Sequence, residues 1–255
     1  MFVDTHCHLH DERIKDVDAT VAAFVRDGVD FVINMGCCAE TSETGKNLAE
    51  KYAPVYFAAG CHPSDANKFN DDEKEKIAAL TSHPKCVAIG EIGLDYYWEP
   101  YDKKLQKDVF VSQLELAKAC KLPVSVHCRD ATGDMLEILK TNKAQLEYGG
   151  VMHCFSGSKE TAAELIKLGF YISFAGPLTF KNANRAVEAA KFVPNEFLLT
   201  ETDCPFLAPH PLRGTTNEPK NVALVTAFMA NLKGVELSEF ASVIKANAKR
   251  LFKKI

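Results

Sequence analysis

The sequence predicts an α/β fold, a single (β/α)8 TIM barrel that takes in all 255 residues. Short apolar runs recur along the chain with helix-favouring segments between them, an alternation typical of parallel α/β sheets. The runs are continuously apolar, as expected of strands buried on both faces. The length agrees, because about 250 residues is usual for this barrel. No linker or low-complexity tract divides the chain, so residues 1–255 are interpreted as one domain.

Eight segments are expected to be strands, in the order Phe2–Thr5, Phe31–Met35, Val55–Ala59, Val87–Glu91, Val124–His127, Val151–Cys154, Tyr171–Phe174 and Phe197–Thr202. The helix-favouring segments between them include Val17–Arg26, Asp71–Leu80, Lys103–Ala119, Lys159–Leu168 and Ala183–Lys191. Helix ends are expected at Gly28, at Gly169 and at the Leu122–Pro123 step. Eight such units favour closure into a barrel.

The composition indicates an ordinary soluble protein, with 47% apolar and 25% charged residues. No run approaches the ~20 apolar residues that cross a bilayer. Asp4 and His6 stand where a secretory signal needs a basic start and an apolar core. We therefore expect a cytoplasmic protein without membrane association or an obligate protein partner. The net charge of −4 gives no overall attraction to nucleic acid, so such a substrate would require a local basic rim.

The chain has nine cysteines, an odd number, and no C-x-x-C pair, so disulfides and structural zinc are both weakly indicated. Five of them directly adjoin a candidate histidine or aspartate: Cys7, Cys61, Cys128, Cys154 and Cys204. Neighbouring strand residues point to opposite faces, so we expect these thiols to pack in the outer layer as small hydrophobes. Metal ligation by them is the less favoured alternative. Free thiols would also fit a reducing compartment.

Histidines and acids stand at the carboxyl ends of several expected strands, where barrel enzymes carry their chemistry. His6 and His8 are two residues apart, so on an extended segment they should project the same way, along with Asp4, and grip one cation. An H-x-H pair alone is a weak signal. Its place on the first strand makes the interpretation much stronger.

Glu91 follows a small apolar run, where an unpaired carboxylate would cost several kcal/mol, on the order of what is lost when a buried ion pair is broken. It either pairs with an arginine or lysine at the barrel mouth or bridges two cations. His127 and His153 end two further runs and, together with Glu91, would form a second metal site. Asp203 would bind the first cation and accept a proton from water, the alternative being a helix N-cap.

Seven motifs together resemble the TatD-type metal-dependent hydrolases, or TatD deoxyribonucleases, of the amidohydrolase superfamily. They are D-T-H-C-H-L, G-C-H-P, I-G-E-I-G-L-D-Y-Y, H-C-R-D-A, H-C-F-S-G, E-T-D-C-P-F-L-A-P and R-G-T-T-N-E-P, in the family's order. The resemblance extends from Phe2 to the C-terminal helix. It implies a (β/α)8 barrel of the metal-dependent hydrolase type.

The resemblance implies two divalent cations and leaves open a third. The first would be held by His6, His8, Glu91 and Asp203, and the second by Glu91, His127 and His153. Glu201 shares the face of Asp203 and is a further candidate ligand for a cation or an attacking water. No lysine ends a strand, so Glu91 would take the bridging role that a carboxylated lysine has in superfamily relatives. Zinc, manganese or iron suits such ligands, and magnesium remains open.

His62, in G-C-H-P, is expected at the mouth, where it would bind or polarise the phosphate; a structural hydrogen bond at the Pro63 turn is the alternative. Arg129 and Arg213 would help to neutralise phosphate charge. The loop after Glu91 contains Tyr96 and Trp98, whose rings would either stack on a terminal base or pack the loop onto the barrel.

The resemblance implies a metal-dependent deoxyribonuclease that hydrolyses phosphodiester bonds from DNA 3′ ends, with single-stranded or frayed DNA preferred. Some similar proteins instead hydrolyse the ester that joins a D-amino acid to transfer RNA. Both substrates present a nucleotide 3′ end to one metal pocket, so the sequence leaves the two activities open. A non-catalytic module that binds nucleic-acid ends or proteins is a third hypothesis, disfavoured because every expected ligand is present.

Overall fold

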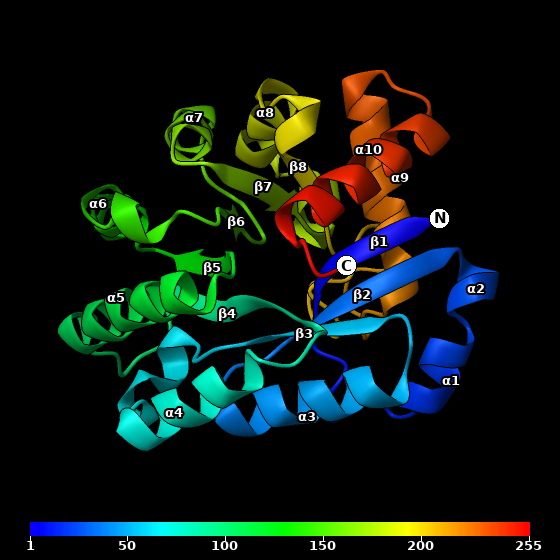
Figure 1. Cartoon of the computed structure of the whole chain (residues 1–255). Helices are drawn as coiled ribbons and strands as arrows, with labels where there is room; N and C mark the ends of the chain where they lie inside the picture. The colour runs from blue at the N-terminus through cyan, green and yellow to red at the C-terminus, as the bar shows by residue number, and fades with distance from the viewer.

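The chain folds as a barrel of eight parallel strands. The computed structural model describes all 255 residues. The strands are hydrogen-bonded in chain order, and a bridge between Cys7 and Cys204 joins the segment after the last strand to the first. Helices surround the strands on the outside (Figure 1). The predicted (β/α)8 fold is therefore confirmed.

The strands are β1 (Phe2–Cys7), β2 (Val29–Met35), β3 (Val55–Ala59), β4 (Cys86–Asp95), β5 (Val124–Arg129), β6 (Gly150–Met152), β7 (Phe170–Phe174) and β8 (Leu198–Thr200). The α-helices are α1 (Val17–Ala22), α2 (Phe24–Asp27), α3 (Ala39–Lys51), α4 (Asp71–Leu80), α5 (Lys103–Cys120), α6 (Thr132–Thr141), α7 (Lys159–Lys167), α8 (Asn184–Phe192), α9 (Val222–Lys233) and α10 (Leu237–Leu251). Short 3-10 helices include η1 (Pro63–Lys68), η3 (Gly176–Thr179) and η4 (Asn195–Phe197).

Several boundaries differ from those predicted. The expected helix Val17–Arg26 is broken at Ala23 into α1 and α2. β1 and β4 extend farther than expected at their carboxyl ends, whereas β6 and β8 end earlier. His153 and Asp203 therefore lie just beyond their strands, although their N–H groups still donate to carbonyls of the neighbouring strands. Each of these two residues is thus hydrogen-bonded through its N–H to one neighbouring strand, which keeps it at the barrel mouth.

One apolar core joins the strands to the inner faces of the helices. It forms a single cluster of 60 buried residues, so no part of the barrel packs independently of the rest. Large rings such as Phe57, Phe110 and Phe170 are fully buried, and each contributes roughly 1.5–3 kcal/mol through burial. None of the helices combines the length and apolar character needed to span a membrane.

Asn247 of α10 ties the C-terminal helix to the start of β8. Its buried side-chain amide donates to the carbonyl oxygens of Asn195 at 2.7 Å and Leu198 at 2.9 Å. Both carbonyls belong to the segment that leads into β8, so the bonds fix the entry of the last strand. Buried carbonyls need such partners because water does not reach them.

Replacing Asn247 by Ala should lower the free energy of unfolding by about 1–3 kcal/mol, because the buried carbonyl of Leu198 and the partly buried carbonyl of Asn195 lose their donor. Urea unfolding followed by circular dichroism measures the change. Lys249→Ala, at an exposed position on the same helix, is the matched control and should leave the midpoint nearly unchanged. Equal midpoints for the two variants would show that the bonds contribute nothing.

Candidate metal centre

Five parts of the fold deliver ionisable side chains to the carboxyl end of the barrel. His6 lies on β1, Glu91 on β4 and His127 on β5, while His153 follows β6 and Asp203 follows β8. Parallel strands that run in chain order around a barrel all end on one side, so residues far apart in sequence meet there. Each of these side chains lies within 4 Å of another member of the group.

The first half of the centre surrounds Oε2 of Glu91. His6 Nε2 lies 3.3 Å from this oxygen and His8 Nε2 lies 3.7 Å from it. The two histidine nitrogens are 3.3 Å apart, and Oδ1 of Asp203 lies 3.3 Å from the nitrogen of His8. Two imidazole nitrogens and two carboxylate oxygens therefore converge on one small volume.

The second half surrounds Oε1 of the same carboxylate. His127 Nδ1 lies 3.0 Å from this oxygen and His153 Nε2 lies 2.9 Å from it, and the two nitrogens are 3.1 Å apart. Glu91 thus presents one oxygen to each half. Its nearest charged partners are histidines, so the alternative of an arginine or lysine partner is not what the structure contains.

The spacing of these atoms fits divalent cations. Ligands at ~2.0–2.1 Å from a tetrahedral ion lie about 3.3 Å from one another. The separations between donor atoms in both halves, 2.9–3.7 Å, are close to this value. Imidazole nitrogens and carboxylate oxygens are also the ligand types that zinc, manganese and iron accept. The residues present therefore fit the metals that the sequence implies.

The charges of the centre depend on one another. Burial opposes ionisation of Glu91, but the surrounding imidazoles, with His153 foremost, hold the pKa of this carboxyl well below its ordinary value. Burial likewise opposes protonation of His153, and the carboxylate of Glu91 raises the pKa of that imidazole well above its usual range. The pKa of Asp203 is lowered, against burial, mainly by its contact with His8. Both carboxylates are thus kept ionised, as a metal site requires.

Asp95, which the sequence patterns did not single out, contacts the second half of the centre through His127. Its Oδ2 lies 3.0 Å from Nε2 of His127, the ring nitrogen opposite the one that faces Glu91. The missed signal was strand length: had β4 been extended to residue 95, alternation would have placed Asp95 on the same face as Glu91. Gly93, with a φ of 137°, lets β4 run close beside β5, because a side chain there would collide with the carbonyl of His127.

Glu201 lies behind His153. Its Oε1 is 3.2 Å from Nδ1 of His153 and accepts the backbone N–H of Cys154 at 2.7 Å, while its Oε2 accepts the hydroxyl of Ser173 at 2.6 Å. The carboxylate therefore contacts the side of the His153 ring that faces away from Glu91. A carboxylate in this position orients a histidine and sets its tautomer.

Asp4 does not project with His6 and His8 as predicted. The pairing of β1 with β2 is irregular between Asp4 and Cys7, so simple alternation fails at this point. The carboxylate accepts hydrogen bonds from the backbone N–H and the hydroxyl of Thr202. Burial raises the pKa of Asp4 to about 8. Asp4 thus links β1 to the segment after β8 and takes no position among the clustered nitrogens.

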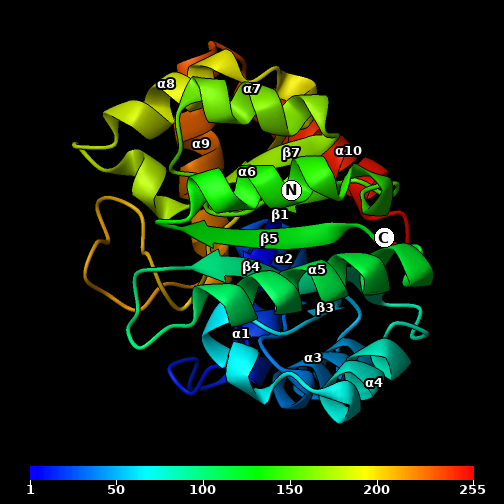
Figure 2. The same cartoon turned by 90° about the vertical axis from the view of Figure 1, so that its left-hand side faces the viewer.

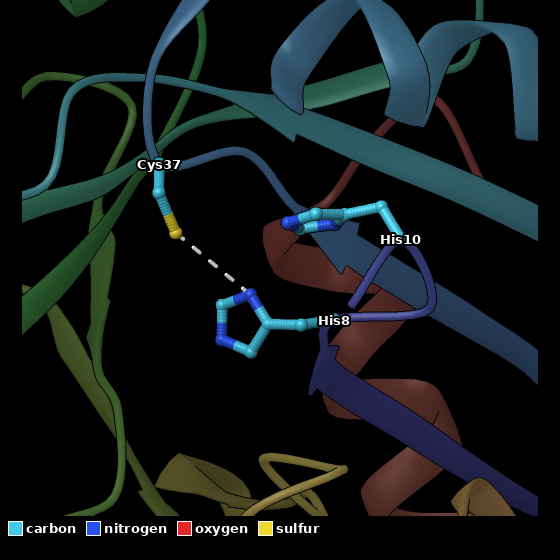
Figure 3. Close-up of side chains that lie close together, drawn as sticks. All are labelled: His8, His10 and Cys37. Carbon is cyan, nitrogen blue, oxygen red and sulfur yellow. Dashed lines mark hydrogen bonds between the residues drawn. The ribbon is translucent and has the colours of Figure 1, made fainter. Parts of the chain in front are cut away.

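His8 has a second set of contacts on its other ring nitrogen. Its Nδ1 lies 3.3 Å from the carbonyl oxygen of Met35 and 3.9 Å from the thiol of Cys37. Figure 3 shows this thiol facing the His8 ring, and it shows His10 on the same loop as His8. His10 contacts Oδ1 of Asn34 at 3.3 Å, and burial lowers its pKa to about 4. These contacts fix the orientation of the His8 ring.

His62 makes the structural bond that was one of its two predicted roles, and it also lies at the mouth. Its Nδ1 accepts the N–H of Ser64 at 3.1 Å, which is the predicted structural bond at the Pro63 turn and caps η1. Its Nε2 lies 3.7 Å from Oε1 of Glu91, at the mouth. Burial lowers the pKa of His62 to about 4, so the ring is neutral at physiological pH. With Nδ1 accepting, Nε2 carries the proton and is available as a donor.

The aromatic rings of the loop after β4 divide between the two predicted alternatives, packing onto the barrel and exposure at its mouth. Tyr96 is half-buried: its hydroxyl donates to Asp134 of α6 at 2.7 Å and its ring stacks on Tyr101. The packing alternative therefore holds for Tyr96. Tyr97 and Trp98 are the exposed rings.

Two arginines lie against aromatic rings, the exposed Tyr97 and Trp98 in one case and the half-buried Phe180 in the other. The guanidinium of Arg129 lies 3.6 Å from the centroid of the Tyr97 ring and 5.4 Å from that of Trp98. The other predicted arginine, Arg213, lies over the ring of Phe180 at 4.5 Å. Both arginines are exposed: Arg129 is the last residue of β5, and Arg213 lies on the segment that follows β8. Together they supply the local basic rim that a polyanionic substrate would need.

All nine cysteines are free thiols. Cys7, Cys61 and Cys204 are fully buried in the apolar core, as predicted. Cys128 is only partly buried but still packs against this core, whereas the prediction is wrong for Cys154. Both thiols line a cavity of about 260 Å³ together with His153 and Arg129. Cys154 lies past the end of β6 with a φ of 43°, so strand alternation does not apply to it. A larger cavity of about 560 Å³, between α3 and α4, contains none of the predicted site residues.

Comparisons with known proteins agree with this geometry. Residues 3–253 match the family model described as TatD related DNase. A Bacillus subtilis protein named uncharacterized metal-dependent hydrolase YabD is 44% identical over 99% of both chains. The 3′-5′ ssDNA/RNA exonuclease TatD of Citrobacter koseri is 34% identical over 94% of both chains. The crystal structure of YJJV, a TatD homolog from Escherichia coli, superimposes with a TM-score of 0.94 at 32% identity and covers 99% of this chain and 98% of its own.

The family model spans nearly the whole chain, and relatives above 30% identity align over nearly their full lengths. The clustered histidines and carboxylates occupy the part of the barrel where hydrolases of this architecture carry their metals. The chain is therefore a metal-dependent hydrolase that belongs to the TatD-related DNase family.

Proposed function

We propose that the protein is a 3′ to 5′ exonuclease that hydrolyses phosphodiester bonds of single-stranded or frayed DNA. The observation that carries the proposal is that the two oxygens of the Glu91 carboxylate face different pairs of histidines. This arrangement suits two cations rather than one, and two cations can stabilise both the attacking and the leaving oxygen of a phosphoryl displacement. The similar Citrobacter protein named as a 3′-5′ exonuclease and the arginines at the mouth support the same choice.

The proposed ligands follow the two halves of the centre. His6, His8, Asp203 and Oε2 of Glu91 would hold one cation, and His127, His153 and Oε1 of Glu91 the other. When bound, such cations polarise a phosphoryl group and lower the pKa of water. Manganese, zinc and magnesium are the candidates, with the nitrogen ligands favouring the first two.

The protein's own groups supply the remaining chemistry. Asp203 is ionised and partly reached by solvent, so it can accept the proton of the attacking water. His62 donates from Nε2 to a phosphate oxygen, and Arg129 adds positive charge at the mouth. Asp95 and Glu201 hold the rings of His127 and His153 in place. We assign Glu201 this positioning role in preference to direct ligation of a third cation.

Asp203→Asn should lower kcat for DNA shortening by a factor on the order of 10²–10⁴, because the proton acceptor is lost. Shortening of a 5′-labelled single strand, with manganese or magnesium present, measures the effect. Circular dichroism should show native secondary structure, which separates loss of chemistry from loss of folding. A fully active variant would remove Asp203 from the mechanism.

The same preparation should be given D-aminoacyl transfer RNA as a second substrate. The expected result is stepwise DNA shortening with slow or undetectable release of the amino acid. Rapid release with intact DNA would instead assign ester hydrolysis to this metal centre. Hydrolysis of neither substrate with any divalent metal would point to a non-catalytic binding module.

Asp95→Asn should weaken metal binding and lower activity by about 10- to 100-fold, because His127 loses the carboxylate that orients its ring. The dissociation constant for manganese, from isothermal titration, gives a readout independent of turnover. Asp108→Asn, on the exposed face of α5, is the control and should bind metal as the native protein does. Unchanged manganese affinity in Asp95→Asn would contradict the positioning role.

Removing metal with a chelator should lower the melting temperature, because cations that bind only the folded state stabilise it. At 100 times the dissociation constant the stabilisation is about 2.7 kcal/mol. Differential scanning calorimetry with and without manganese measures the shift. Glu91→Gln should lose most of the metal-dependent shift, since this residue faces both halves of the centre. A shift that persists in this variant would place the bound metal elsewhere.

A further inference from the structure

Phe206 is an exposed aromatic residue directly beside the proposed metal centre. It lies in the loop between β8 and α9, three residues after Asp203, and 40% of its surface is exposed. Its ring meets the ring of His8 edge to face, with centroids 5.8 Å apart. Leu207, next to it, is equally exposed. Two large apolar side chains thus face solvent at the edge of the reaction centre, a position that favours a role in ligand contact.

The loop does not need the Phe206 ring to hold its shape. The buried side chain of Asn217 donates to the carbonyl oxygens of Thr202 and Phe206, at 2.9 and 2.8 Å. The backbone N–H of Asn217 donates to Pro205, and that of Phe206 donates to Asp203. These bonds fix the backbone while leaving the ring free for another contact.

A neighbouring segment supports the same loop from outside. Gly176, at the start of η3, lies so close to the carbonyl of Leu207 that any side chain there would collide with it. Thr179, in the same turn, accepts the N–H of His210 at 2.8 Å. Leu207 itself has a φ of 54°, a strained backbone conformation for leucine. A rigid, locally strained loop therefore presents Phe206 in one fixed position.

Arg13, on the loop that follows β1, lies beside Phe206. Its guanidinium is 4.0 Å from the centroid of the Phe206 ring. Asp11 holds it through two bonds, from Nε at 2.8 Å and from Nη2 at 2.7 Å. The Nη1 nitrogen makes no hydrogen bond within the chain, and 44% of the side chain is exposed. A preorganised donor therefore stands next to an exposed aromatic ring.

The pairing of an arginine with an aromatic ring recurs on this end of the barrel. Arg129 lies over Tyr97, and Arg213 lies over Phe180. The loops that carry these pairs project from the same end of the molecule, at the left of Figure 2. An aromatic face binds a nucleobase, and a guanidinium binds the phosphate beside it. Each pair therefore offers the two kinds of group that contact a nucleotide of a single strand.

We infer that Phe206 and Arg13 form a nucleotide subsite at the first-cation side of the centre. Phe206 stacks on a base at or next to the 3′ end, and Arg13 contacts the adjoining phosphate. The inference rests on the proposed exonuclease function and gives it a residue-level basis for preferring unpaired bases, because a base within a duplex cannot stack on the ring. The subsite uses π-stacking and charge, so it carries little sequence preference.

The test uses the full chain with manganese and a single-stranded oligonucleotide that carries 2-aminopurine at its last or penultimate position and phosphorothioate linkages at its 3′ end. Binding to the native protein should quench the fluorescence through stacking. Phe206→Ala should lose the quenching at one position and raise the dissociation constant by about 5- to 150-fold. Phe206→Tyr should restore both. On an oligonucleotide lacking that base, the native protein and Phe206→Ala should bind equally.

Arg13→Gln should make binding less dependent on salt, lowering the slope of log K against log salt by about 0.7, as expected for one lost phosphate contact to a single strand. Phe192→Ala is the matched control for Phe206→Ala, because Phe192 is 49% exposed at the C-terminal end of α8. This variant should bind the oligonucleotide like the native protein. If the native protein binds and shortens DNA but Phe206→Ala is unchanged, the subsite is wrong and the exonuclease function stands. If the native protein neither binds nor cleaves single strands, both are wrong.

Discussion

The rest of the structure is organised around a single buried carboxylate, Glu91, and the imidazoles that surround it. An ionised carboxylate at this depth is costly unless charges or ligands of opposite sign face both of its oxygens. The barrel meets this requirement by bringing histidines from β1, β5 and the end of β6 to within 3.7 Å of the two oxygens. Three of the four histidines that face Glu91 in the two halves have a second partner that fixes the ring, whereas Nδ1 of His6 has no hydrogen-bond partner. Asp95, Glu201 and the carbonyl of Met35 are these partners.

Most of the fold and much of the centre could be predicted from the sequence, because both depend on where strands end. Continuous apolar runs predict buried parallel strands, and the residues just after those runs must meet at one end of a closed barrel. His6, Glu91, His127, His153 and Asp203 could be grouped on this basis, and the structure brings them together.

The remainder depends on features that periodicity does not encode. The position of Asp95 depends on how far β4 continues, and that of Asp4 on an irregular pairing within β1. Which tyrosine of the loop after β4 faces solvent is decided by Asp134, 38 residues farther along the chain. The partnership of Phe206 with Arg13 joins two loops from opposite ends of the sequence. Contacts of this kind are set by tertiary packing, and no local sequence pattern predicts them.

The seam between β1 and the segment after β8 has a consequence for biosynthesis. Asp4 accepts the backbone N–H of Thr202, which is 198 positions away in sequence, and the same seam brings Asp203 to His6 and His8. A ribosome-bound chain that has not yet released residues 201–203 holds His6, His8 and Glu91 without the carboxylate of Asp203. The earliest and latest parts of the barrel thus meet in one place, so the first-cation pocket is assembled only when the ring closes. A cation bound there would therefore join the first and last parts of the barrel and stabilise the finished fold.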